Sequence, residues 1–209
     1  MPEQWINPVA WSPRLVAQLM AKGWRTFQLD LEGGLHSAET IAWAIDHLRA
    51  CAGELVVRVP ADDLPLLRKL ARLGCRRFMV PGFSSIGELQ AVVRSVRECS
   101  DEARIVAMVE TAALMDAIAT IARIEGVSGV HFGLVDLCRD MGVDDWRDVD
   151  QLPREVIAHA GEARTRGLAV GTYMLPPWRD THWPRHFDVH SYVLSEFALP
   201  EVSASQLSQ

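Results

Sequence analysis

The sequence predicts a compact (β/α)8 barrel, an α/β fold in which eight parallel strands alternate with helices. Short apolar runs alternate with longer segments of helical period from one end of the chain to the other. No linker, low-complexity segment or abrupt change of composition divides the 209 residues. We therefore expect residues 1–209 to form a single barrel domain, with residues 200–209 as a flexible tail.

The first half of the chain supplies four strands and the helices that follow them. Ser12 is a good N-cap and Pro13 suits the first helical position, so a helix begins there and ends at Gly23. The clearest strand is the β-branched run between Gly53 and Pro60. The expected strands are Gln4–Asn7, Arg25–Asp30, Leu55–Val59 and Arg77–Val80, and the further helices are Glu39–Cys51, Asp62–Leu73 and Ile86–Val96.

The second half continues the alternation. The expected strands are Ile105–Val109, Gly129–Gly133, Leu168–Tyr173 and Ser191–Leu194, and the expected helices are Ala112–Arg123 and Arg154–Arg166. Eight successive units favour a closed barrel over an open doubly wound sheet, although the count depends on weak first and eighth strands.

The composition is typical of a cytoplasmic protein. Twenty-one Lys and Arg residues against 27 Asp and Glu residues give a net charge of −6, which argues against a dedicated nucleic-acid binder or a partner of anionic membranes. No apolar stretch approaches the roughly 18 to 20 residues that cross a bilayer, and no signal peptide is evident. The four cysteines form no CxxC pair, so we expect them to be reduced and structural.

Ionisable residues lie at or just after the ends of several predicted strands, where barrels of this kind carry their chemistry. They are Asp30, Glu32, Arg58, Glu110 and Asp136. Each one alone is an ordinary cap or solvated residue, but a buried strand rarely carries a charge such as Arg58 without a partner. Carboxylates from neighbouring strands suit Mg²⁺ or Mn²⁺ with positions left for substrate. A 2-oxo acid can chelate such an ion, and Arg58 can share the charge of its enolate.

Glu110 lies in Val-Glu-Thr-Ala, and Asp136 follows 26 positions later in Phe-Gly-Leu-Val-Asp-Leu. This pair of motifs resembles the HpcH/HpaI aldolase and citrate lyase β-subunit superfamily. The likeness covers residues 24–142, with a weaker continuation through Gly171 and Ser195, and its further matches are Arg58 in Val-Val-Arg-Val, Pro81, Gly142 and Asp30-Leu31-Glu32.

The resemblance implies a (β/α)8 barrel in which Glu110 and Asp136 hold Mg²⁺ or Mn²⁺. It also implies that Arg58 binds the 2-oxo acid or enolate oxygen, and that backbone amides near Val135 and Asp136 receive the substrate carboxylate. Members of the family cleave or form carbon–carbon bonds through pyruvate-like or acyl-CoA enolates. They associate as trimers or hexamers, so the expected partners are a small 2-oxo acid, an aldehyde and further copies of the chain.

The loop after the second strand departs from the family pattern. Pyruvate-type aldolases carry Asp-x-Glu-His there, whereas this chain reads Asp30-Leu-Glu-Gly-Gly-Leu-His36, with the histidine three positions late. His36 with Asp30 or Glu32 is the hypothesised acid/base set, and a solvated loop histidine is the alternative. Asp-Leu-Glu alone looks more like the citryl-CoA and malyl-CoA lyases. However, the chain has no lid-forming extension after Ser195 and no basic cluster for CoA phosphates, which favours small free acids.

These residues lead to the hypothesis of a divalent-metal-dependent carbon–carbon lyase of the class II aldolase type. The alternatives are citrate-synthase-like or acyl-CoA lyase chemistry, and a non-catalytic barrel that binds a carboxylic acid or serves in an assembly. The chain is shorter than the roughly 250 residues typical of the fold. Relative to the family, the connection from Val96 to Ile105 is brief and little follows the eighth strand. We therefore expect a barrel shortened between strands four and five and at the C-terminus.

Overall fold

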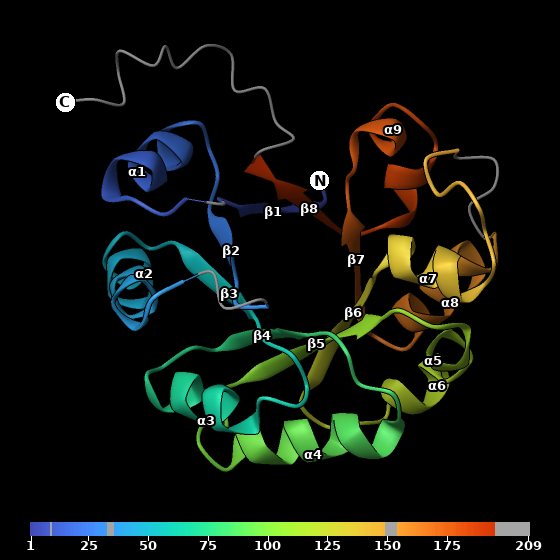
Figure 1. The fold of residues 1–209 in the computed structure, drawn as a ribbon, viewed down its shortest axis with the longest axis horizontal. Coiled ribbons are helices and arrows are strands. Elements are labelled where there is room, and N and C mark those ends of the chain that lie inside the picture. The colour runs from blue at the N-terminus through green and yellow to red at the C-terminus, as the bar shows by residue number, and fades with distance from the viewer. Residues whose placement is uncertain (9, 33–35, 149–153, 195–209) are drawn as a thin grey trace.

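The computed structural model describes residues 1–8, 10–32, 36–148 and 154–194, and in it eight parallel strands close into a barrel in sequence order (Figure 1). The predicted (β/α)8 fold is thus confirmed. The weak first and eighth strands pair with each other over their full length, which closes the barrel. The strands are β1 Glu3–Asn7, β2 Thr26–Asp30, β3 Glu54–Arg58, β4 Arg77–Val80, β5 Arg104–Val109, β6 Val127–Phe132, β7 Ala169–Tyr173 and β8 Val189–Val193.

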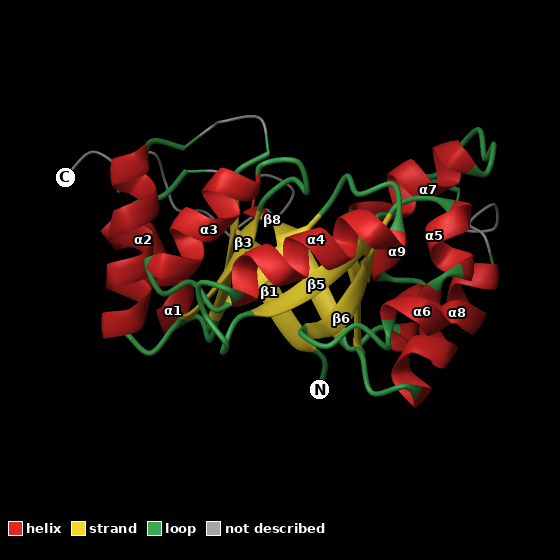
Figure 2. Cartoon of the chain, turned by 90° about the horizontal axis from the view of Figure 1, so that it is seen from below, coloured by secondary structure: helices red, strands yellow, loops and turns green. Residues whose placement is uncertain are grey.

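The helices surround the strands, as the side view shows (Figure 2). Ser12 and Ser85 cap the helices that follow them by accepting a backbone N–H bond, as a serine N-cap does. The helices are α1 Pro13–Ala21, α2 Ala38–Ala50, α3 Leu64–Arg72, α4 Ile86–Arg97, α5 Ala112–Asp116, α6 Ile118–Ile121, α7 Leu134–Asp140, α8 Glu155–Thr165, α9 Pro176–Arg179 and the 3-10 helix η2 Trp183–His186.

Two helical segments differ from the sequence-based expectation. The single helix expected over residues 112–123 is interrupted at Ala117, where φ is −87° and ψ is 5°. The short helix α7 was not expected, because its N-cap is Gly133 and no side chain caps it. The expected tail over residues 200–209 lies outside the described residues. Between strands four and five, α4 ends at Arg97 and β5 begins at Arg104.

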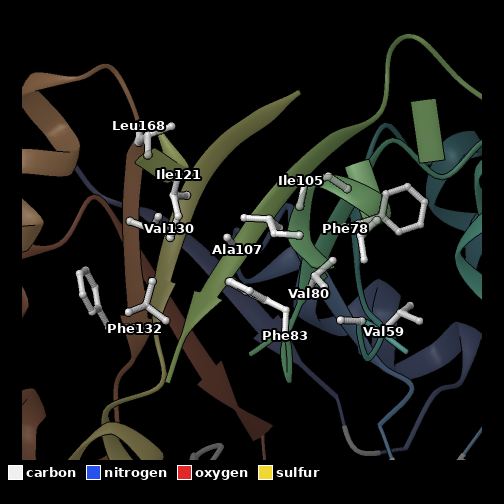
Figure 3. Close-up of a cluster of buried hydrophobic side chains, with 14 of the residues drawn as sticks. Val59, Phe78, Val80, Phe83, Ile105, Ala107, Ile121, Val130, Phe132 and Leu168 are labelled. Carbon is white, nitrogen blue, oxygen red and sulfur yellow. The ribbon is translucent and has the colours of Figure 1, made fainter. Parts of the chain in front are cut away.

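Alternate side chains along each strand face two different cores. The outward ones pack under the helices, and Figure 3 shows Phe78, Val80, Ile105, Ala107, Val130 and Phe132 of this layer. The inward ones form a smaller apolar cluster inside the barrel, with Trp5, Val56, Met79, Val106, Met108 and Val189. This period of two is the reason that residues two apart, such as Val56 and Arg58, share the barrel interior.

Polar side chains also enter the barrel. His131 and Gln28 are both fully buried, and the imidazole Nε2 of His131 lies 3.0 Å from the hydroxyl of Ser191. A Cβ on Gly171 would lie 2.9 Å from the His131 ring, so glycine provides the space for that ring. At the N-terminal end, Arg77 donates to the Glu3 carboxylate at 2.7 Å. The polar side chains of Gln28 and His131 therefore lie level with the apolar cluster, since Gln28 pairs with Val56 and His131 with Met108.

All four cysteines are free. Among the described residues, no helix combines the length and the apolar character that crossing a membrane requires.

Candidate active site

A cavity of about 260 Å³ opens at the C-terminal ends of the strands. Asp30, Arg58 and Asp136 line it, together with the backbone of Gly133, so three of the ionisable residues singled out in the sequence meet there. Its other lining residues are Asn7, Met108, Leu134, Val135, Tyr173, Leu175, Trp178 and Val193. The arrangement follows from parallel strands, whose carboxyl ends all reach one face of the barrel.

Arg58 is anchored between two carboxylates from the neighbouring strand. Asp30 and Arg58 occupy paired positions on β2 and β3, and Nη1 of Arg58 lies 2.9 Å from the Asp30 carboxylate. The same nitrogen forms an ion pair with Glu32, whose backbone N–H donates to Asp30. Nε of Arg58 lies 3.4 Å from the sulfur of Met108. A charged side chain on a buried strand requires an opposite charge, and Arg58 has two, Asp30 and Glu32. These two carboxylates hold the guanidinium in one orientation.

Glu110 directly follows β5, and two backbone contacts fix its side chain. The N–H of Gly82 donates to its carboxylate at 2.9 Å. A Cβ on Gly133 would lie only 2.9 Å from Cγ of Glu110, so the glutamate lies against bare glycine backbone. Gly133 is held there by its own N–H, which donates to the carbonyl of Val109. The close packing of the ends of β5 and β6 therefore determines where this carboxylate points.

Burial raises the pKa of Glu110 above its ordinary value, and the negative charges of Asp136 and Glu32 raise it further. The N–H of Gly82 and the charge of Arg58 oppose this rise without cancelling it. Glu110 and Asp136 therefore lie close enough for the charge of one to act on the other. Such a pair of carboxylates favours a nearby cation.

Asp136 lies in the first turn of α7 and its side chain is 54% exposed. Its carboxylate accepts a hydrogen bond from Arg139, three residues later, at 2.7 Å. Val135 lines the same cavity, next to Asp136. The first amides of a helix have no acceptor within the helix, and here no side chain caps them.

His36 lies just before α2, after residues 33–35, which are outside the described residues. It is partly buried and does not line the cavity as described. Burial lowers the pKa of His36 below its ordinary value, and the charge of Asp30 opposes the shift. The imidazole is therefore predominantly neutral near pH 7 and lies within electrostatic reach of Asp30.

The donor set fits a hard divalent cation. Within the described ranges, no three His, Cys, Asp or Glu side chains form a complete metal cage. Glu110, directly after β5, and Asp136, in the first turn of α7, nevertheless supply two carboxylates that act on each other. Mg²⁺ commonly takes one or two carboxylates, with water and substrate completing its shell, so these two residues could hold such an ion.

Several residues that line the cavity were not predicted from the sequence. Asn7 and Tyr173 end β1 and β7, so the strand-end rule that pointed to Arg58 applied to them also. The hydroxyl of Tyr173 is hydrogen-bonded to Gln28, and burial raises its pKa to about 12. Trp178, in the Pro-rich stretch from Leu175 to Pro184, reaches the cavity from the short helix α9.

Comparison with known proteins identifies the family of the chain. The model of the HpcH/HpaI aldolase/citrate lyase family matches residues 10–174. A 4-hydroxy-2-oxovalerate aldolase of Novosphingobium aromaticivorans is 25% identical in an alignment of length 167, which covers 66% of this chain and 62% of that protein. A hydroxypyruvate/pyruvate aldolase of Roseovarius nubinhibens is 26% identical in an alignment of length 192, which covers 78% of this chain and 74% of that protein.

The chain thus spans less than two thirds of the length of the first of these relatives. Among solved structures, an HpcH/HpaI aldolase from Desulfitobacterium hafniense superposes with a TM-score of 0.77 at 19% identity, over 92% of this chain and 86% of the other. This likeness supports the fold. Because the family model covers most of the barrel, the chain belongs to the HpcH/HpaI aldolase/citrate lyase family.

Proposed function

We propose that the protein is a divalent-metal-dependent carbon–carbon lyase of the class II aldolase type, acting through the enolate of a pyruvate-like 2-oxo acid. The observation that carries the proposal is a single cavity that joins Asp30, Arg58 and Asp136, with the Glu110 carboxylate held beside it. The aldolase names of the two relatives support the same class of reaction.

In this proposal Glu110 and Asp136 hold Mg²⁺ or Mn²⁺. When bound, the ion supplies a Lewis acid for the keto oxygen of the substrate. Arg58 donates to the oxygen that becomes negative in the enolate. Nη1 of Arg58 donates to Asp30 and forms an ion pair with Glu32, and the proposal gives Nη2 to the substrate. The amides of Val135 and Asp136 at the uncapped start of α7 receive the substrate carboxylate.

Proton transfer at the alcohol of the bond being broken is assigned to His36 with Asp30 or Glu32. The lowered pKa of His36 supports a role as base, because a neutral imidazole can accept a proton near pH 7. Asp30 has a second role, since its carboxylate also orients Arg58.

The cavity favours a small free acid over a CoA thioester. Its volume is about 260 Å³, and Arg58 is the sole basic side chain among its described lining residues. The phosphates of CoA require several cations, whereas a 2-oxo acid requires one in addition to the metal. Citrate-synthase-like chemistry, acyl-CoA cleavage and a non-catalytic carboxylic-acid site are the competing outcomes. A trimeric or hexameric assembly stays a prediction.

The direct test is exchange of the pyruvate methyl protons in D2O, followed by proton NMR with and without Mn²⁺ or Mg²⁺. Enolate formation needs no aldehyde, so exchange measures the first half of the reaction alone. We expect metal-dependent exchange in the wild-type protein, and loss of both Mn²⁺ binding and exchange in Glu110→Ala. Exchange that persists in metal-free protein would contradict the proposal.

Calorimetry with Mg²⁺ and oxalate, a planar enolate mimic, separates the remaining outcomes. Oxalate binding without exchange would indicate a non-catalytic acid site, and no binding at all would favour a structural role. Mass spectrometry of products from pyruvate, oxaloacetate and acetyl-CoA would distinguish aldol from Claisen chemistry.

A further inference from the structure

The carboxylates of Glu110 and Asp136 belong to two neighbouring segments of the chain. Glu110 lies between β5 and α5, and Asp136 lies in the first turn of α7. The helices α5 and α7 are side by side in both views of the fold (Figure 1, Figure 2). The distance between the two carboxylates therefore depends on how these two segments are held together.

Asp140 supplies a hydrogen bond between α7 and α5. Its carboxylate accepts from the backbone N–H of Ala112, the first residue of α5, at 2.8 Å. The first amides of a helix have no acceptor within the helix, so they bond to another segment or to water. Asp140 is the last residue of α7, where an aspartate faces unpaired backbone carbonyls and is unfavourable. The bond to α5 therefore gives this aspartate a role that α7 alone does not.

A second hydrogen bond joins the same two segments. The N–H of Gly133 donates to the carbonyl of Val109, which directly precedes Glu110. We call this bond and the bond between α7 and α5 the two bridging bonds. One lies before Glu110 and the other after it, and they also lie on either side of Asp136. Together they close a ring of the chain that contains both carboxylates.

The geometry of α7 gives the effect of losing the bond at Asp140. With a rise of about 1.5 Å per residue, Asp136 lies roughly 4.5 Å along the helix from Gly133, and Asp140 roughly 10.5 Å. A tilt of α7 about Gly133 therefore moves Asp136 by roughly two fifths of the movement at Asp140. Leu134 and Leu137 pack α7 against the core, but apolar contacts are not directional. Metal sites tolerate about 0.2 Å in ligand distance, so a movement of about 0.5 Å at Asp140 is enough to matter.

We propose that Asp140 is a positioning residue for the metal site, because its bond to Ala112 holds Asp136 at a fixed distance from Glu110. The inference rests on the proposed function, since these two carboxylates are the ones assigned to Mn²⁺ or Mg²⁺. Asp140 is not among the described residues that line the cavity. It is therefore assigned no contact with the ion or the substrate, and it acts through the backbone of α5.

The test breaks the bond from both of its ends. Asp140→Ala removes the acceptor. Ala112→Pro removes the donor and leaves every charge in place. Proline suits the first position of a helix, and Thr111 before it has the extended backbone that proline requires, with φ −134° and ψ 155°.

Titration calorimetry with Mn²⁺ measures the result. We expect each variant to raise the Kd for Mn²⁺ at least about tenfold, as loss of a group that orients a metal ligand does. The double variant should bind about as weakly as either single variant, because both remove the same bond. Independent effects would multiply to about 100-fold, and that outcome would overturn the inference.

Asp140→Asn separates the bond from the charge. The amide oxygen of asparagine can still accept from Ala112, so we expect a Kd within about threefold of the wild type. A Kd as high as that of Asp140→Ala would show that the negative charge acts on the ion directly, and would overturn the positioning role.

Asp63→Ala is the matched control for stability. Asp63 accepts from the backbone N–H of Leu66 at the start of α3, at 3.0 Å, and α3 follows β3, which is two strands away from β5 in the barrel. Both alanine variants should lower the Tm by a few degrees, but only Asp140→Ala should weaken Mn²⁺ binding. An equal loss of Mn²⁺ affinity in Asp63→Ala would reduce the effect of Asp140 to general stability and contradict the proposal.

Amide hydrogen exchange of Ala112, measured by NMR without metal, is an independent readout. We expect protection in the wild type and in Asp140→Asn, and fast exchange in Asp140→Ala. If Asp140→Ala does not fold, Ala112→Pro and the exchange of the wild type carry the test. An unprotected Ala112 amide in the wild type overturns the inference. Unchanged Kd values in Asp140→Ala and Ala112→Pro overturn the inference and leave the proposed function standing, whereas a wild type that binds no Mn²⁺ overturns both.

Discussion

Replacing Gly133 by alanine tests how the site positions the Glu110 carboxylate. The φ angle of Gly133 is −81°, so alanine causes no backbone strain there. The new Cβ would lie 2.9 Å from Cγ of Glu110 and 3.5 Å from Cε of Met108. The substitution therefore acts by steric displacement of one side chain that the proposal assigns to the metal.

The structure sets the size of this displacement. Carbon atoms in contact are ordinarily about 3.5–4.0 Å apart, so Cγ of Glu110 must recede by roughly 0.6 Å. That movement breaks the 2.9 Å hydrogen bond from Gly82, and a bond to a charged group contributes about 1.5–3 kcal/mol. Partial relaxation reduces the expected loss of unfolding free energy to about 1–2 kcal/mol. Metal sites tolerate about 0.2 Å in ligand distance, so Mn²⁺ affinity should fall at least about tenfold, or 1.4 kcal/mol.

The assays are titration calorimetry with Mn²⁺ and thermal unfolding without metal. We expect a Tm a few degrees below that of the wild type, together with the weaker Mn²⁺ binding. Gly161→Ala is the matched control, since a Cβ on Gly161 meets nothing within 4 Å in the middle of α8. Helix propensity predicts that this control gains roughly 0.5–1 kcal/mol. Unchanged Mn²⁺ affinity in Gly133→Ala, despite measurable wild-type binding, would refute the role given to the Glu110 position.

Three further predictions follow from the same geometry. Arg58→Lys keeps a positive charge but loses the guanidinium fork. We therefore expect kcat/KM to fall about 100-fold and the rate of pyruvate methyl-proton exchange to fall in parallel. An unchanged exchange rate would contradict the oxyanion role of Arg58. His36→Asn should lower kcat about 100-fold. It should also remove the acidic limb of the wild-type pH–rate profile, which we expect below pH 6.5 because burial lowers the pKa of His36 and protonation inactivates a base. An acidic limb that persists in the variant would belong to another group. Burial raises the pKa of Glu3, but the hydrogen bonds and charge of Arg77 outweigh it, so the net pKa is lowered. Ionised Glu3 therefore stabilises the fold above its unfolded-state pKa, and this stabilisation is lost as the pH falls through the lowered value. Glu3→Gln should lower the unfolding free energy by about 1 kcal/mol at pH 7, a value that allows for the 38% exposure of the Glu3 side chain. In strong acid the variant and the wild type should differ little, because Glu3 is then protonated. Urea titration at both pH values measures the two differences.

Much of the fold could be predicted from the sequence because its signals are local. The bounds of β4 agree fully with the expectation, the predicted Ser12 cap precedes α1, and α4 begins at Ile86 as expected. Caps and apolar periods act within a few residues, so a linear reading captures them. The break at Ala117 carried no such signal. The short α7, which has no side-chain cap, was missed for the same reason.

Part of the candidate site could also be predicted from the sequence, and part could not. Asp30, Arg58 and Asp136 could be proposed because a parallel barrel brings strand ends to one mouth, and they do line one cavity. His36 could not be placed from the sequence, since its distance from the cavity depends on the path of the loop. The roles of these residues stay predictions until the variants are measured.

The sequence by itself determined the order of the eight strands, the family resemblance and the charged residues at the mouth. Only the tertiary structure decided that the Tyr173 hydroxyl meets Gln28 inside the barrel and that Glu110 lies against the backbone of Gly133. The physical reason is the range of the interactions. Gln28 and Tyr173, which share a hydrogen bond, are 145 positions apart, and such neighbours exist only once β1 and β8 have closed the barrel.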